Sequence, residues 1–288
     1  MNFKILFSLI FFTGFLFANE ISVAVPLSPY AKIAKEIAKE KAEVLTLIPE
    51  NSDPHTFEPK PKILKQFSAS SIYFTDGAFD KNWLSRFLSV NKNVKVVPLT
   101  EGILFNKMEH RHHHAEQKHT EEHEEAFDPH LWTSFENIKI IARNILNALT
   151  TFDSENKTYY EKNYSEYLKK INSLSEKVQK IISKLPENKK KFMVFHPSFG
   201  YLAKEYHLKE ICIEIEGKEV KPKDLEHLIQ EAKKESIETI FIMPQFSKRA
   251  AASIAKSLNA NIVEINPLAY EFENQIEFLI TSIAKSIK

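Results

Sequence analysis

Cysteine and glycine are scarce in this chain, and their scarcity excludes several classes of protein. Cys212 is the single cysteine among 288 residues, so no intramolecular disulfide can form. The five glycines stand at positions 14, 77, 102, 200 and 217. At this spacing neither a dinucleotide-binding fingerprint nor a P-loop can be written. G-x-S-x-G and H-E-x-x-H motifs are also missing, so nucleotide enzymes, serine hydrolases of that type and zincin proteases are not expected.

Long apolar runs are missing too, apart from one at the N-terminus. Lys4 precedes an apolar segment over residues 5–17, which is shorter than the about 20 residues that a spanning helix needs. Ala18 is a suitable last residue before cleavage, so residues 1–18 are predicted to be a secretory signal peptide. Because no cysteine follows this segment, we expect no lipoprotein anchor, and the mature protein is predicted to be a soluble protein of the periplasm.

The predicted mature chain has a formal net charge of zero. Removing Lys4 with the signal peptide leaves 38 basic and 38 acidic residues. Nucleic acid is therefore not an expected partner, because neutralising phosphates needs a basic face. A mature chain of about 270 residues is too long to fold around one small hydrophobic core, so two lobes are expected.

Short β-rich runs alternate with amphipathic helical runs in both halves of the chain. Alternation of this kind predicts an α/β fold of parallel sheets flanked by helices, with an N-terminal lobe over residues 19–150 and a C-terminal lobe over residues 188–288. Strands are expected at 21–25, 44–48, 72–75, 94–97, 192–195, 211–215, 239–243 and 262–265, and helices at 28–40, 61–67, 79–90, 198–206, 224–234, 247–258 and from about 271.

A long helix is predicted between the two lobes. Over residues 154–185 apolar side chains recur in alternating steps of four and three, from Tyr160 to Leu185. Bounded by two α/β halves, this stripe favours one helix of about 48 Å laid along both lobes, within a linking segment at 151–187. The helix before it is predicted to begin with a capping box of Thr133 and Glu136.

A histidine-rich insert is predicted at residues 108–126. Six of the eleven histidines lie between His110 and Glu125, mixed with glutamates and with almost no apolar residues. Such a segment cannot bury enough surface to become ordered, so we expect it to be disordered. Its composition favours a weak collector of divalent metal, and the alternative is a solvated polar loop without a role.

Three further histidines stand in short proline-marked frames: Asp-Pro-His at His55, Asp-Pro-His at His130 and His-Pro at His196. A fourth frame is Asn266-Pro267-Leu268. His55, His196 and Asn266 follow predicted strands, and parallel sheets bind ligands beyond the carboxyl ends of their strands. Single imidazoles from distant loops suggest one zinc site with an open coordination position.

The ordered motifs resemble the ZnuA-like solute-binding proteins, the periplasmic zinc-binding components of bacterial ABC importers (metal-binding cluster A-I). The resemblance covers nearly all of the mature chain. It rests on DPHTFEPKP at 53–61, the histidine-rich insert, DPHLW at 128–132, HPSFGYLAKEY at 196–206, IEGKEVKPKDL at 215–225, FIMPQFS at 241–247 and NPL at 266–268.

This resemblance implies that metal is held between two lobes joined by a rigid helix and is delivered to an ABC permease of the inner membrane. It places the metal-binding histidines at His55, His130 and His196. Manganese-binding relatives carry a carboxylate at the third place, so His196 favours zinc, Zn(II) being the transported ligand. Many relatives have Asp-Pro-Leu where this chain has Asn266. The fourth coordination position of the metal could therefore be filled by Asn266, by water, or by a carboxylate such as Glu216 or Glu219.

The leading hypothesis is a monomeric, non-enzymatic zinc carrier. A manganese-specific carrier of the same family is one alternative. A zinc-dependent hydrolase is another, because three histidines and an open position also describe catalytic zinc, although no carboxylate base stands in a local motif. A metal-regulated surface or adhesion protein is the third.

Overall fold

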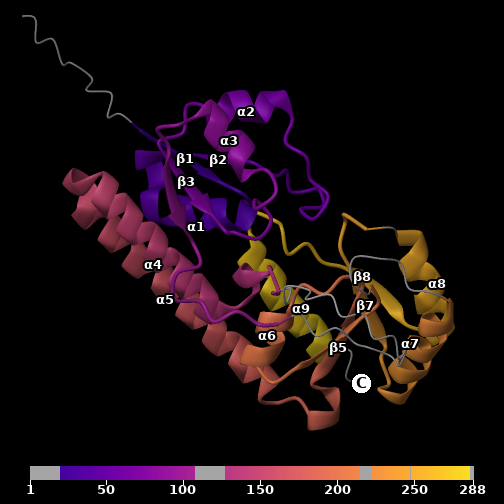
Figure 1. The fold of residues 1–288 in the computed structure, drawn as a ribbon. Coiled ribbons are helices and arrows are strands. Elements are labelled where there is room, and N and C mark those ends of the chain that lie inside the picture. Colours follow the sequence, from indigo (N-terminus) through magenta and orange to yellow (C-terminus); the bar gives the residue numbers. More distant parts are fainter. Residues whose placement is uncertain (1–19, 108–126, 215–221, 247, 286–288) are drawn as a thin grey trace, which may run out of the picture.

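Two four-stranded parallel sheets form the framework of the protein, one in each lobe (Figure 1). The computed structural model describes residues 20–107, 127–214, 222–246 and 248–285. The predicted signal peptide and the histidine-rich insert lie outside the described residues. Strand order is β2-β1-β3-β4 in the first sheet and β6-β5-β7-β8 in the second, so the second lobe repeats the plan of the first. The predicted α/β fold class is confirmed.

The strands are short, and each sequence-predicted strand has a counterpart within about two residues. Their bounds are β1 Ile21–Val25, β2 Ala42–Thr46, β3 Ile72–Thr75, β4 Lys95–Pro98, β5 Lys191–Val194, β6 Lys209–Cys212, β7 Thr239–Ile242 and β8 Asn261–Glu264.

Helices connect the strands and cover the sheets. Their bounds are α1 Ser28–Ala38, α2 Pro61–Phe67, α3 Leu84–Val90, α4 Phe135–Phe152, α5 Lys157–Ile182, α6 Gly200–Glu205, α7 Pro222–Lys234, α8 Lys248–Leu258 and α9 Phe272–Lys285. A single 3-10 turn, Leu131–Thr133, precedes α4.

The two central strands of the second sheet, β5 and β7, are buried on both faces, as parallel strands are when helices cover both sides. Phe192 and Val194 of β5 belong to a large apolar cluster that continues through α4, α5 and α9 into the first lobe. Met193 and Phe195 point the opposite way, into a smaller cluster under α7 and α8. The larger cluster is therefore shared between the lobes, and the smaller one belongs to the second lobe alone.

The long helix α5 runs along one side of the molecule beneath both lobes (Figure 1). It packs against α1 of the first lobe and α9 of the second. Tyr160, Tyr167, Ile171 and Val178 of the predicted stripe are buried, so the prediction of one helix spanning both lobes is confirmed. With 26 residues the α-helical part is about 39 Å long, shorter than predicted because residues 154–156 form a separate 3-10 turn and the helix ends at Ile182.

Two local predictions are wrong. The N-cap of α4 is Ser134, whose Oγ accepts a hydrogen bond from Asn137 N at 3.3 Å, while Thr133 belongs to the preceding turn and donates to His130 O. Helix α3 begins at Leu84 instead of residue 79, because Phe79 N is held by the Asp76 carboxylate in a loop after β3. Both differences come from local hydrogen bonds between a side chain and the backbone three residues away, which periodicity does not register.

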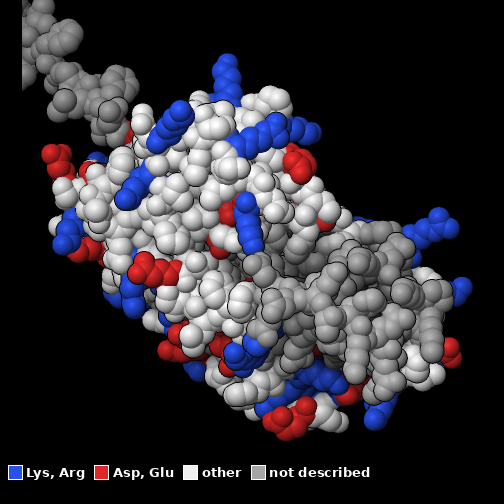
Figure 2. All heavy atoms as spheres, in the orientation of Figure 1, with Lys and Arg blue, Asp and Glu red and all other residues white. Residues whose placement is uncertain are grey.

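Charged side chains are scattered over the described surface, with lysines, arginines and acids separated by broad uncharged areas on the face drawn in Figure 2. Among the described residues, none of the helices is both long and apolar enough to cross a membrane.

Candidate metal centre

Three histidines from distant segments meet between the lobes. His55 lies in the loop after β2, His130 stands just before the turn that precedes α4, and His196 follows β5. One ring nitrogen from each lies within 4.8 Å of the others. His55 Nε2 is 3.2 Å from His196 Nε2, and the three ring centroids are 4.9 to 5.7 Å apart. The predicted triad is thus brought together in space, as a metal ion would need.

Aromatic rings surround the triad. Phe79 contacts the His55 ring edge-on at 5.0 Å between centroids, and Phe246 stacks on His196 at 4.9 Å. Trp132 lies 5.6 Å from His130. The histidines line a hollow of about 20 Å³, which is room for one ion or one water molecule. His130 and His196 are buried in these surroundings, whereas His55 stays exposed on one side of the hollow.

The surroundings of His55 and His130 lower the pKa of both imidazoles. Burial, reinforced by the neighbouring His130 and His196, lowers the pKa of His55 to about 4. Burial also lowers the pKa of His130, although the adjacent Asp128 opposes this shift. At neutral pH both rings are uncharged, and an uncharged ring nitrogen has the lone pair that binds a metal.

Two carboxylates hold the buried histidines by their second ring nitrogens. His130 Nδ1 lies 2.8 Å from Asp128 Oδ1, and His196 Nδ1 lies 2.6 Å from Glu214 Oε2. A carboxylate only accepts, so each Nδ1 carries the proton and each Nε2 presents its lone pair. Both pairs are largely buried, which leaves the rings little freedom to turn.

Gly200 allows Asp128 to reach this position. A Cβ added at Gly200 would stand 2.6 Å from Asp128 Oδ2, closer than any real contact. Because Asp128 comes from the first lobe and Gly200 begins α6 of the second, this close approach is one of the contacts between the lobes.

Asn266 occupies a different position from the histidines. Its Oδ1 accepts hydrogen bonds from Gln245 Nε2 at 3.2 Å and from Leu268 N at 3.1 Å. Its neighbours Pro267 and Leu268 line the hollow, and Asn266 is not among the lining residues. Its assignment as the fourth ligand stays a prediction. The alternatives Glu216 and Glu219 lie outside the described residues.

Two residues of the site were missed by the sequence analysis. Glu214 holds His196, and Gln245 lines the hollow. Both follow strands of the second sheet, β6 and β7, at the same edge as His196. The available signal was a polar residue just after each of these strands, but no motif distinguishes it from an ordinary loop residue.

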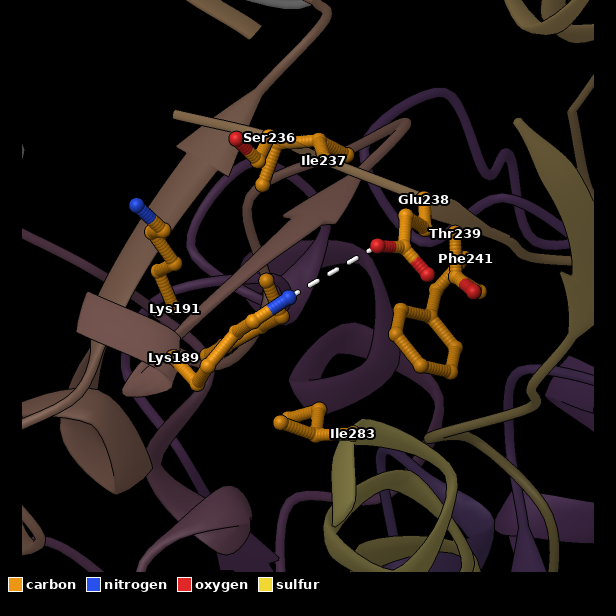
Figure 3. A pocket seen from close by; sticks show the side chains of 9 residues that line it. Lys189, Lys191, Ser236, Ile237, Glu238, Thr239, Phe241 and Ile283 are labelled. Atoms are coloured by element: carbon orange, nitrogen blue, oxygen red, sulfur yellow. Dashed lines mark ion pairs between the residues drawn. The ribbon is translucent and has the colours of Figure 1, made fainter. Parts of the chain in front are cut away.

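A second hollow lies where β5 and β7 begin, at the opposite edge of the same sheet (Figure 3). Lys189 and Glu238 form an ion pair there at 3.6 Å, and Ile283 of α9 closes one side.

Within the described parts of the chain, the three histidines are the only group of at least three potential metal ligands.

The family comparison agrees with this geometry. Residues 23–285 match the family model described as "Zinc-uptake complex component A periplasmic". The chain belongs to this ZnuA family of metal-binding ABC substrate-binding proteins. Its family is one of solute-binding transport proteins that work with an ABC permease, and not of enzymes.

Relatives within the ZnuA family carry the names of two metals. The high-affinity zinc uptake system protein ZnuA of Bacillus subtilis is 30% identical over 254 residues, covering 87% of this chain and 79% of that protein. The manganese ABC transporter substrate-binding lipoprotein PsaA of Streptococcus pneumoniae is 27% identical over 257 residues, covering 85% and 79%. Family membership therefore establishes a metal-binding protein without choosing the metal.

Solved structures of ZnuA share the fold over nearly their whole length. A crystal structure of ZnuA superimposes with a TM-score of 0.84 at 30% identity, covering 93% of this chain and 99% of that one. A ZnuA deletion mutant with zinc bound superimposes with a TM-score of 0.83, also at 30% identity, covering 92% and 97%.

Proposed function

We propose that this protein captures Zn(II) outside the inner membrane and delivers it, as a monomeric periplasmic carrier, to the permease of an ABC importer. The observation that carries the proposal is the convergence of His55, His130 and His196 on one point between the lobes. Three imidazole nitrogens form a donor set that suits zinc and leaves one coordination position open for exchange.

The choice of zinc over manganese rests on donor chemistry. Manganese binds preferentially to oxygen ligands, whereas imidazole favours later transition metals. His196, where manganese-binding relatives are expected to carry a carboxylate, gives this site a third nitrogen. The names of relatives support both metals, so a manganese-specific carrier is the second candidate.

Competition titrations of the mature protein with zinc and manganese test the proposal. We expect one tight zinc site and much weaker manganese binding. His55→Ala, His130→Ala and His196→Ala should each lower zinc affinity by more than about 100-fold, because two imidazoles cannot close the shell.

His207→Asn is the matched control, because His207 is exposed and its φ of 54° suits asparagine. It should leave the zinc isotherm unchanged. Tighter manganese than zinc binding would favour the second candidate, and wild-type affinity in all three alanine variants would show that the triad does not bind metal.

A further inference from the structure

Gln245 has an unpaired, buried side-chain oxygen and belongs to the lining of the three-histidine hollow. It follows β7 and lines the same hollow as His55, His130 and His196. Its Oε1 is inaccessible to solvent and has no hydrogen-bond partner in the structure. A buried acceptor without a partner costs free energy, about 1–3 kcal/mol, so such an atom calls for a ligand or an ordered water.

The orientation of the Gln245 amide is fixed by its other end. Nε2 donates to Glu50 O at 2.7 Å and to Asn266 Oδ1 at 3.2 Å. Both of these atoms are acceptors, so turning the amide over would place oxygen against oxygen. Nε2 is therefore held by Glu50 of the first lobe and by Asn266, which follows β8, and Oε1 has no hydrogen-bond partner.

Asn266 has no comparable oxygen to offer. Its single side-chain acceptor already receives hydrogen bonds from Gln245 Nε2 and Leu268 N. An amide oxygen has two lone pairs, and both are engaged. Asn266 thus acts on Gln245, by holding its nitrogen, and Gln245 retains the free lone pairs.

We propose that Gln245 presents its Oε1 to the fourth coordination position of the three-histidine site and is the residue that sets the metal preference there. This inference rests on the proposed function. It gives the site a neutral oxygen in addition to three nitrogens, so no anion contacts the ion directly. A site of three imidazoles and one neutral oxygen suits zinc, whereas manganese favours a shell made mainly of oxygen ligands.

Two substitutions of Gln245 test the role of its oxygen. Gln245→Met keeps the length of the side chain and removes the oxygen, and it should lower zinc affinity by about 10- to 100-fold. Gln245→Glu keeps an oxygen and adds a charge, and it should raise manganese affinity more than zinc affinity. The visible spectrum of bound cobalt(II) should change in both variants, because it reports the ligand set directly.

Gln179→Met and Gln179→Glu, on the exposed side of α5, are the matched controls and should behave as the wild type. Thermal unfolding of the metal-free variants identifies any loss of folding. If Gln245→Met binds zinc as the wild type does, with the same cobalt spectrum, the inference is overturned while the proposed function stands. If the wild type fails to bind zinc, the proposed function and the inference are both overturned.

Discussion

At the scale of single residues, the candidate metal site separates nitrogen donors from negative charge. The three imidazoles that face the hollow are the donors, whereas Asp128 and Glu214 stand behind two of them. A dication bound to the imidazoles would be one ring away from each carboxylate. The carboxylates would therefore stabilise its charge through the rings without occupying a coordination position.

Glu214→Gln should lower zinc affinity by about 10- to 100-fold. Glutamine can still accept from His196 Nδ1 but lacks the negative charge that makes the imidazole a stronger ligand. Competition titration measures the change. Glu264→Gln is the control, because Glu264 ends the neighbouring strand β8 and its ion pair with Lys248 is exposed. Equal zinc affinities for wild type and Glu214→Gln would contradict this role.

Asp76 is a buried acid in the first lobe, and it makes the free energy of unfolding depend on pH. Its Oδ1 accepts from the backbone of Ala78 and Phe79, while its Oδ2 is buried without a partner. Burial, reinforced by the nearby Asp80, raises the pKa of Asp76 from 3.8 to about 8. The folded protein therefore retains a proton that the unfolded chain releases above pH 3.8.

The stabilising contribution of protonated Asp76 is fully present below pH 3.8, falls as pH rises, and is lost above about pH 8. Asp76→Asn stays neutral throughout, so at pH 9 it should be more stable than the wild type, whereas the two proteins should differ much less at pH 4. Denaturant unfolding of both metal-free proteins between pH 4 and pH 9 measures the difference. Parallel stability profiles for the two proteins would contradict the assignment.

At the scale of helices and strands, periodicity in the sequence was enough to predict the architecture. Short β-rich runs became parallel strands, and the stripe containing Tyr160 and Ile171 became the buried side of α5. These predictions succeeded because burial of one face imposes a repeat on the sequence. The boundaries were less predictable where a nearby side chain holds the backbone in a loop, as Asp76 does before α3.

The residues of the candidate site were likewise only partly predictable from the sequence. The three histidines could be predicted, because each carries a proline-marked frame that a reader can recognise in the sequence. Glu214 and Gln245 could not, because their roles depend on which way a loop directs a side chain after its strand. Asn266 shows the same limit: its frame was visible, but its hydrogen bonds to Gln245 and Leu268 were not.

At the scale of the whole molecule, the lobes are joined on both sides of the metal site. Trp132 Nε1 donates to Pro267 O at 2.8 Å, and Tyr201 donates to Asp128 O at 2.9 Å. Away from these contacts, Tyr270 N donates to the Glu50 carboxylate at 3.1 Å. Together with α5 and a shared core, these bonds favour small movements between the lobes over a wide hinge motion.

The histidine-rich insert should be separable from this assembly. Its two ends are already joined, because Lys107 and Phe127 pair as an antiparallel bridge and Asp128 N donates to Asn106 O at 3.0 Å. Deleting residues 110–125 leaves three residues between Lys107 and Phe127, enough for a short hairpin loop. His130 should therefore stay in place, and the deletion variant should keep the tight zinc site while losing the weaker zinc sites. Calorimetric titration with zinc measures the tight and the weak phase of binding.

A full-length variant with the six insert histidines replaced by asparagine should bind zinc as the deletion variant does. Loss of the tight phase in both variants would instead show that the insert supplies a ligand of the main site.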